Sequence, residues 1–184
     1  MNSPLKIGIG FGVGWCLVKY ISFLINPLPD NILPTVLLNI LFLLTAIALA
    51  LYQIKRNQAE EDSALGDIKN GLKAGLPYTV LVASFLYLFY GTINPEFNQK
   101  QIEKTNARIE KDFNNPIEYE TLKKSNPTFE VMTKEELKIQ MKKGPQTFYT
   151  PGITMTVSLL AMLLLSTLYS ILVSVIYRRI VFRH

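Results

Sequence analysis

The sequence is poor in the side chains that most enzymes use for metal binding and nucleophilic catalysis. It contains one histidine, His184, and one cysteine, Cys16. A zinc or haem site draws several ligands from such residues, and a Ser–His–acid triad requires an internal histidine. We therefore predict no catalytic residues, no metal site and no cofactor. The single cysteine also excludes an intrachain disulfide.

Acidic residues are missing from the apolar parts of the chain. Four long apolar blocks occupy residues 7–25, 34–54, 72–93 and 153–177. Each has about the 20 residues that a helix needs to cross a hydrocarbon core about 30 Å thick. None of the 14 acidic residues lies in a block, and of the 19 basic residues only Lys19 and Lys73 do. Because helices of soluble proteins carry charge along one face, we predict an all-α membrane protein with four transmembrane helices.

The absence of carboxylates from the blocks also removes the usual proton-relay and cation-coupling groups of transporters. The basic residues near the block ends favour an orientation with both termini in the cytoplasm. The cytoplasmic set is then Lys6, Lys55, Arg56, Lys69, Lys73, Arg178, Arg179 and Arg183.

The blocks divide the chain into three regions. Residues 1–93 hold the first three transmembrane helices, with a short cytoplasmic connection at about 55–71. Within this connection, Leu65, Ile68 and Leu72 recur at helical spacing and predict a short amphipathic helix at the membrane interface. Residues 94–150 form an external segment, and residues 151–184 hold the fourth helix and a basic cytoplasmic tail.

The external segment 94–150 is predicted to be helical. Residues 96–113 are rich in Glu, Lys, Gln and Arg and contain neither Gly nor Pro. Thr133 and Glu136 have the spacing of a capping box, and we expect the helix that they begin to end at Gly144 and Pro145. The segment has too little apolar content for a large core, so we expect two helices packed on each other, on the membrane surface or on a partner. Its charges are interleaved, which does not favour nucleic-acid binding.

Glycines alternate along the first block, in the stretch "GIGFGVGWCLVK". A dinucleotide-binding loop needs G-x-G-x-x-G after a strand, and no frame of this stretch places the third glycine correctly. In a helix the glycines instead form two overlapping G-x-x-x-G pairs, which allow close packing between membrane helices. The helix-packing candidates of this stretch are Gly8, Gly10, Gly12 and Gly14.

Lys19 is the one cation well inside an apolar block. At 100° per residue it lies on the same helix face as Gly8 and Gly12. It either reaches the outer interface or makes a structural pair, or it contacts an anionic headgroup, a substrate or an external carboxylate such as Asp30 or Glu96. Trp15, one turn earlier, offers its ring face to the same contact.

Small residues recur at helical spacing in two other blocks. The larger set is a serine stripe in the fourth block, and the smaller is an alanine pair in the second. Such stripes serve close helix packing and interhelical hydrogen bonds. The candidates are Ser166, Ser170 and Ser174, with Ala46 and Ala50.

The layout resembles a family of uncharacterised small bacterial inner-membrane proteins, known as a domain of unknown function. The resemblance rests on "IGIGFGVG" in the first block, "ALGDIKNGLKAG" before the third, and "MTKEELKIQMKK" followed by "TPG" before the fourth. It covers nearly the whole chain. The resemblance implies four spans, a long charged segment between spans three and four, and an inner (cytoplasmic) membrane location. It brings no catalytic residues.

From these observations we expect a protein that is not an enzyme. The first hypothesis is a non-enzymatic accessory or scaffold subunit of a bacterial envelope complex, in contact with the lipid bilayer. A protein partner or a second copy would bind its transmembrane helices and the segment 94–150. The alternative is a small transporter or lipid-handling protein that uses Lys19 to contact an anionic group. A weaker alternative is an accessory to a lipid-linked sugar enzyme.

Overall fold

The described residues of the computed structural model, 3–29, 31–57 and 63–181, form helices and short connections with no strand. The all-α prediction is therefore confirmed for this part of the chain. The elements are α1 (Ser3–Ile25), α2 (Leu33–Asn57), α3 (Ala64–Leu88), η1 (Phe89–Ile93), α4 (Pro95–Asn114), α5 (Pro116–Lys124), α6 (Pro127–Glu130), α7 (Lys134–Phe148), α8 (Pro151–Ile176) and η2 (Tyr177–Val181).

Four helices are long and apolar enough to cross a membrane, as the apolar blocks predicted. Their outward faces are covered by large apolar side chains, for example Leu17 and Leu164, which are 58% and 68% exposed. In water this surface would be unfavourable, whereas lipid tails cover it at no cost. The chain is a multi-pass membrane protein. The candidate spans are Pro4–Ile25, Leu33–Arg56, Ala64–Ile93 and Pro151–Val181.

The chain divides into two compact units. We call Met1–Tyr87 together with Met155–His184 the bundle unit, and Leu88–Thr154 the hairpin unit. The bundle unit contains α1, α2 and nearly all of α3 and α8. The hairpin unit contains the charged helices between them.

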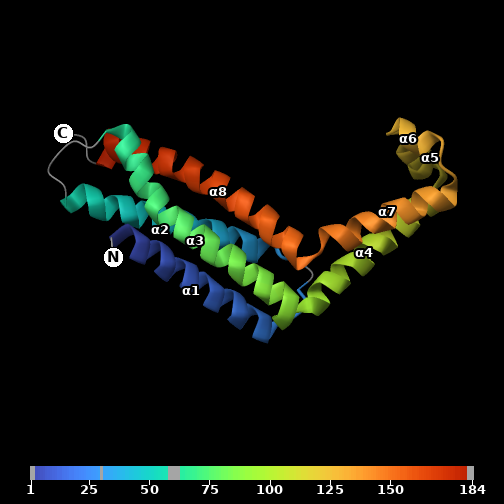
Figure 1. The fold of residues 1–184 in the computed structure, drawn as a ribbon, viewed down its shortest axis with the longest axis horizontal. Coiled ribbons are helices and arrows are strands. Elements are labelled where there is room, and N and C mark those ends of the chain that lie inside the picture. The colour runs from blue at the N-terminus through green and yellow to red at the C-terminus, as the bar shows by residue number, and fades with distance from the viewer. Residues whose placement is uncertain (1–2, 30, 58–62, 182–184) are drawn as a thin grey trace. The chain divides into compact units, whose positions relative to one another are not determined.

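In the bundle unit, α3 contacts each of the other three helices. Gly8 of α1 lies against the backbone of Ala74, and Tyr78 bonds to Asn39 of α2. Gly71 lies against Ser170 of α8. Figure 1 shows α3, in green, running between α1 and α8. The buried core of this unit lies along α3 and along the inward face of α2, where Leu43, Ile47 and Leu51 are at most 1% exposed.

The beginning of α3 differs from the prediction. The helix starts at Ala64 and continues without a break into the third span, so there is no separate interfacial helix in the described residues. Leu65, predicted to lie on the apolar face of a helix at the membrane interface, is 75% exposed, and Asp67 and Asn70 are buried. The polar face of this turn points into the bundle because it meets polar partners there.

Asn-Pro pairs set the helix starts of the hairpin unit. Asn94, Asn115 and Asn126 are the N-caps of α4, α5 and α6, and each is followed by proline at the first helical position. Each asparagine side chain accepts a hydrogen bond from a backbone N–H of the first turn. Proline fits there because it has no N–H to leave unpaired.

The helices α4 and α7 pack side by side (Figure 1) around a small core of Ile109, Phe113 and Leu137. The predicted capping box is present, with Thr133 and Glu136 bonded to each other's backbone N–H. The predicted stop at Gly144 and Pro145 is wrong, because α7 continues to Phe148 with Pro145 inside it.

A charged contact crosses from α4 to α7. Lys138 Nζ lies 2.7 Å from Glu110 Oε2, and Lys142 Nζ lies 2.5 Å from Oε1. The hydrogen bond from Lys138, followed by that from Lys142, holds the pKa of the Glu110 carboxyl below its usual range. The hydrogen bond to Glu110 also raises the pKa of Lys138.

Candidate functional site

A buried carboxylate, Asp67, lies in the first turn of α3. Ser63 begins this helix as its N-cap, because its Oγ accepts a hydrogen bond from the N–H of Gly66. Asp67 is only 1% exposed. A carboxylate near the N-terminus of a helix is favoured by the helix dipole, and its burial requires charged or polar partners.

Three side chains from three other elements surround Asp67. Arg178 of η2 donates from Nε to Oδ2 at 2.5 Å, and Ser174 of α8 donates to the same oxygen at 3.4 Å. Lys55 at the end of α2 places Nζ 2.9 Å from Oδ1. This last contact is an ion pair without hydrogen-bond geometry, and Oδ1 has no hydrogen-bond partner among the described residues. We call Lys55, Asp67, Ser174 and Arg178 the Asp67 cluster.

The Asp67 cluster joins α2, α3 and the end of α8. Forming a buried ion pair gains little net stability, because both charges lose their hydration. Removing one partner is different, since it leaves a buried charge without compensation and costs about 3–5 kcal/mol. The cluster therefore specifies which helix ends meet.

The position of Asp67 in α3 corrects the expectation that no carboxylate lies within a membrane span. The helix that carries the third apolar block extends to Ala64, so Asp67 is part of the candidate span Ala64–Ile93. The block was too short because the polar residues before Leu72 ended it in the sequence.

One and two turns after Asp67 along α3, glycines pack against the predicted serine stripe of α8. A Cβ added at Gly71 would lie 2.7 Å from Ser170 Oγ and 2.9 Å from its Cβ. A Cβ added at Gly75 would overlap Ser166 Oγ. All three serines are buried, and Ser170 Oγ donates to the Ser166 carbonyl at 2.7 Å. Each serine thus lies opposite a residue of α3, with Ser174 opposite Asp67.

A second polar layer lies further along α3. Tyr78, fully buried, donates its hydroxyl to Asn39 Oδ1 at 2.5 Å, and Asn39 Nδ2 contacts the sulfur of Met162 at 3.5 Å. These contacts link α2, α3 and α8. The hydroxyls of Thr79 and Ser166 are buried without a hydrogen-bond partner among the described residues.

The four glycines of α1 have different surroundings. A Cβ added at Gly8 would overlap the carbonyl oxygen of Ala74, and one at Gly12 would lie 3.4–3.7 Å from Leu81 and Tyr78. At Gly14 it would lie 3.4 Å from the ring of Phe42 in α2. At Gly10 it would meet nothing within 4 Å in the described residues. The structure therefore places Gly8 and Gly12 against α3 and leaves Gly10 on the outside.

Trp15 and Lys19 continue the buried face of α1. Trp15 is 2% exposed and packs edge-on against Phe85 of α3, with ring centroids 6.2 Å apart. Its indole Nε1 is buried without an acceptor among the described residues. Lys19 is 8% exposed. Of the carboxylates considered as its partners, Asp30 lies outside the described residues and Glu96 belongs to the hairpin unit.

On α2, the predicted pair Ala46 and Ala50 is fully buried. Ile47 between them approaches Gly75, because its Cδ1 would lie 3.3 Å from a Cβ added there. Near the helix end, Tyr177 donates its hydroxyl to the carbonyl of Ala48 at 3.0 Å. The small side chains thus lie on the inward face of α2.

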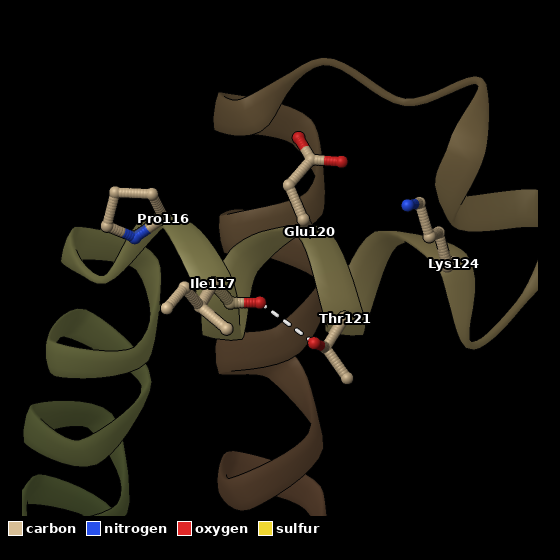
Figure 2. Close-up of a pocket in the computed structure, with 5 residues that line it drawn as sticks. All are labelled: Pro116, Ile117, Glu120, Thr121 and Lys124. Carbon is tan, nitrogen blue, oxygen red and sulfur yellow. Dashed lines mark hydrogen bonds between the residues drawn. The ribbon is translucent and has the colours of Figure 1, made fainter.

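A shallow depression of about 430 Å³ lies along α5 in the hairpin unit. Figure 2 shows that its lining residues follow one another along the same short helix, and that the Thr121 hydroxyl donates to the Ile117 carbonyl, at 2.8 Å. Glu120 and Lys124 contribute opposite charges. The described residues contain no cluster of His, Cys, Asp and Glu that could hold a metal ion. The Asp67 cluster is therefore the candidate site with the most developed geometry.

A comparison with protein families matches residues 6–179 to the family described as "Protein of unknown function (DUF4199)". The chain belongs to this family. The match spans α1 to η2 and agrees with the resemblance seen in the sequence motifs. No curated protein and no solved structure matches the chain. For this family member the site must therefore be interpreted from its own residues.

Reasoning from the sequence missed the Asp67 cluster. Lys55 and Arg178 were assigned to the basic residues near helix ends, and Asp67 fell within the short cytoplasmic connection at about 55–71. One signal could have found it: Asp67, Gly71 and Gly75 recur every four residues, as do Ser166, Ser170 and Ser174. Paired in antiparallel order, the two stripes place Ser174 opposite Asp67 and Arg178 one helical turn beyond it.

Proposed function

We propose that this membrane protein is a non-enzymatic accessory or scaffold subunit of an envelope complex. The bundle unit acts as a fixed support, and the hairpin unit contacts a protein partner or a second copy of the chain. The proposal keeps both termini on the cytoplasmic side, as the basic residues near the span ends favour.

The observation that carries the proposal is the way polar groups are used inside the bundle unit. Asp67 joins three helix ends, and Tyr78 bonds to Asn39 across α2 and α3. The serines of α8 fit against glycines of α3. Interhelical contacts of this kind stabilise one arrangement of helices, as a support requires.

The hairpin unit supports the second half of the proposal. It is charged and has a small core, yet Ile117 and Val131 are 77% and 84% exposed, and Ile139 on α7 is 58% exposed. Interfaces between proteins commonly surround apolar side chains with a polar rim. We therefore assign the partner contact to this unit.

Site-specific photo-crosslinking in the native membrane tests the assignment. A photoreactive residue at Ile117 or Val131 should give a discrete crosslinked species above the monomer mass. The same residue at Lys111, an exposed position of α4, is the matched control and should give a weaker product. If none of these positions gives a discrete product and the protein purifies as a monomer without a partner, the scaffold proposal is wrong.

A second candidate function rests on Trp15 and Lys19. Both side chains are buried on the same face of α1, and the Trp15 N–H has no acceptor within the described part of the chain. A lipid-handling protein that contacts an anionic group would use such a donor beside a cation. Trp15→Phe, which keeps the ring packing against Phe85, and Lys19→Met separate this role from the scaffold. If these variants no longer support the protein's function in the cell but crosslink as the parent protein does, the lipid-handling role is favoured. If the variants function like the parent protein, this role is excluded.

A further inference from the structure

The Asp67 cluster carries more positive than negative charge. Two cations, Lys55 and Arg178, contact a single carboxylate. Among the described residues the cluster therefore has an excess of one positive charge. This excess lies where three helix ends meet and is partly buried, so it attracts an anion more strongly than a fully hydrated cation does.

The two cations are partly exposed and are not fully used by Asp67. The side chains of Lys55 and Arg178 are 15% and 33% exposed, whereas that of Asp67 is 1% exposed. Arg178 uses only Nε for Asp67, and its Nη2 is buried without an acceptor among the described residues. A guanidinium offers a planar fork of N–H donors that matches the oxygens of a phosphate.

The cluster lies at the depth of lipid phosphates. With a rise of 1.5 Å per residue, Lys55 is about 16 Å along α2 from the middle of the apolar block 34–54. Arg178 is about 20 Å from the middle of block 153–177 by the same rise. The hydrocarbon core reaches only about 15 Å from the bilayer centre, and the headgroups follow.

We propose that the outer side of the Asp67 cluster binds the phosphate of an anionic membrane lipid. Asp67 neutralises one of the two positive charges from the inside, and the lipid phosphate supplies the missing negative charge from the outside. Asp67 competes with the ligand for Lys55 and Arg178, and these two cations contact the ligand. This site does not depend on the scaffold role of the hairpin unit.

Thermal unfolding of the full chain in a mild detergent tests the proposal. Added phosphatidylglycerol should raise the Tm more than the same amount of phosphatidylcholine. Arg178→Gln should lose more than half of the phosphatidylglycerol shift, and Lys55→Gln should do the same. Their exposed neighbours provide matched controls, since Arg179→Gln and Arg56→Gln remove the same charge one position away and should keep most of the shift.

The variant Asp67→Asn separates lipid binding from a structural ion pair. It lowers the Tm without lipid, because the cations lose their internal partner. If the cluster binds lipid phosphate, the phosphatidylglycerol shift becomes larger, since nothing competes with the lipid for the cations. A purely structural cluster predicts an unchanged shift, which would overturn the proposal.

Two further outcomes test whether the bound phosphate belongs to a lipid and whether it binds at the Asp67 cluster. An equal rise in Tm with inorganic phosphate would overturn the assignment to a lipid. Equal lipid shifts in Arg178→Gln and Arg179→Gln would show that only the overall charge of this membrane face matters, which would also overturn it. If Arg178→Gln does not fold, Lys55→Gln against Arg56→Gln gives the same comparison.

Discussion

Gly8→Ala and Gly10→Ala make the sharpest test of the packing in the bundle unit. Both substitutions add one methyl group to the same helix. At Gly8 the new Cβ would overlap the carbonyl oxygen of Ala74 and lie 2.9 Å from its carbonyl carbon. Because these are backbone atoms of α3, no side-chain rotation relieves the overlap, and α1 must move away. At Gly10 the methyl would meet nothing within 4 Å in the described residues.

The expected difference follows from these contacts. Overpacking of this kind costs about 1–3 kcal/mol, whereas alanine in an open helix position gains up to about 1 kcal/mol over glycine. For a chain of this length, each kcal/mol corresponds to about 2–4 °C in Tm. Gly8→Ala should therefore lower the Tm by about 2–12 °C, and Gly10→Ala should leave it unchanged or slightly higher.

The assay is thermal unfolding of the detergent-solubilised full chain, followed by helical circular dichroism and by loss of the monodisperse peak. Gly12→Ala gives an intermediate case, because its nearest neighbour is the flexible end of Leu81, at 3.4 Å. It should cost less than Gly8→Ala. Equal Tm values for Gly8→Ala and Gly10→Ala would refute the close approach of α1 to α3.

Three further predictions concern single contacts. Tyr78→Phe removes the hydroxyl bonded to Asn39 and should lower the stability of the bundle unit by about 0.6–2 kcal/mol, measured by unfolding in detergent. Thr133→Ala removes the N-cap of α7 and should cost about 1 kcal/mol, seen as faster hydrogen exchange at the start of α7. Because the folded pKa of Glu110 is lowered by the two lysines of α7, its contact stabilises the hairpin unit above the unfolded pKa and is lost as the pH falls through the folded pKa. Exchange in α4 and α7 should therefore rise in acid, after correction for the intrinsic pH dependence of exchange, and Glu110→Gln should reduce that rise.

The membrane spans could be predicted from the sequence because the bilayer imposes a simple length requirement. About 20 apolar residues must follow one another, and no polar backbone group can remain unpaired. The starts of α4 and α7 were also predicted closely, since helix propensity and a capping box act over a few neighbouring residues. These signals depend on residues that are close together in the sequence, so they can be recognised without knowing how the helices pack.

The Asp67 cluster could not be predicted in this way. Asp67 and Arg178 are separated by 111 positions, so their contact depends on how α3 and α8 pack. Asp67 is followed closely by Lys69 and Asn70, and a stretch this polar is typical of a connection exposed to water. Only the contact with Arg178 shows that Asp67 is buried. The end of α7 was misplaced because the helix continues past Pro145, whose carbonyl accepts a hydrogen bond from the N–H of Tyr149 at 3.0 Å.

The position of α3 among the other helices has a consequence for the biosynthesis of the protein. A ribosome makes Lys55 before Asp67, whereas Arg178 follows only after the whole hairpin unit has been made. A charged carboxylate costs about 2.5–3.5 kcal/mol at the centre of a membrane helix and less near the helix end, where Asp67 lies. We expect Lys55 to serve as the counter-ion of Asp67 while the nascent chain waits for α8. The arrival of Arg178 and Ser174 then closes the last helix onto a carboxylate that is already in place.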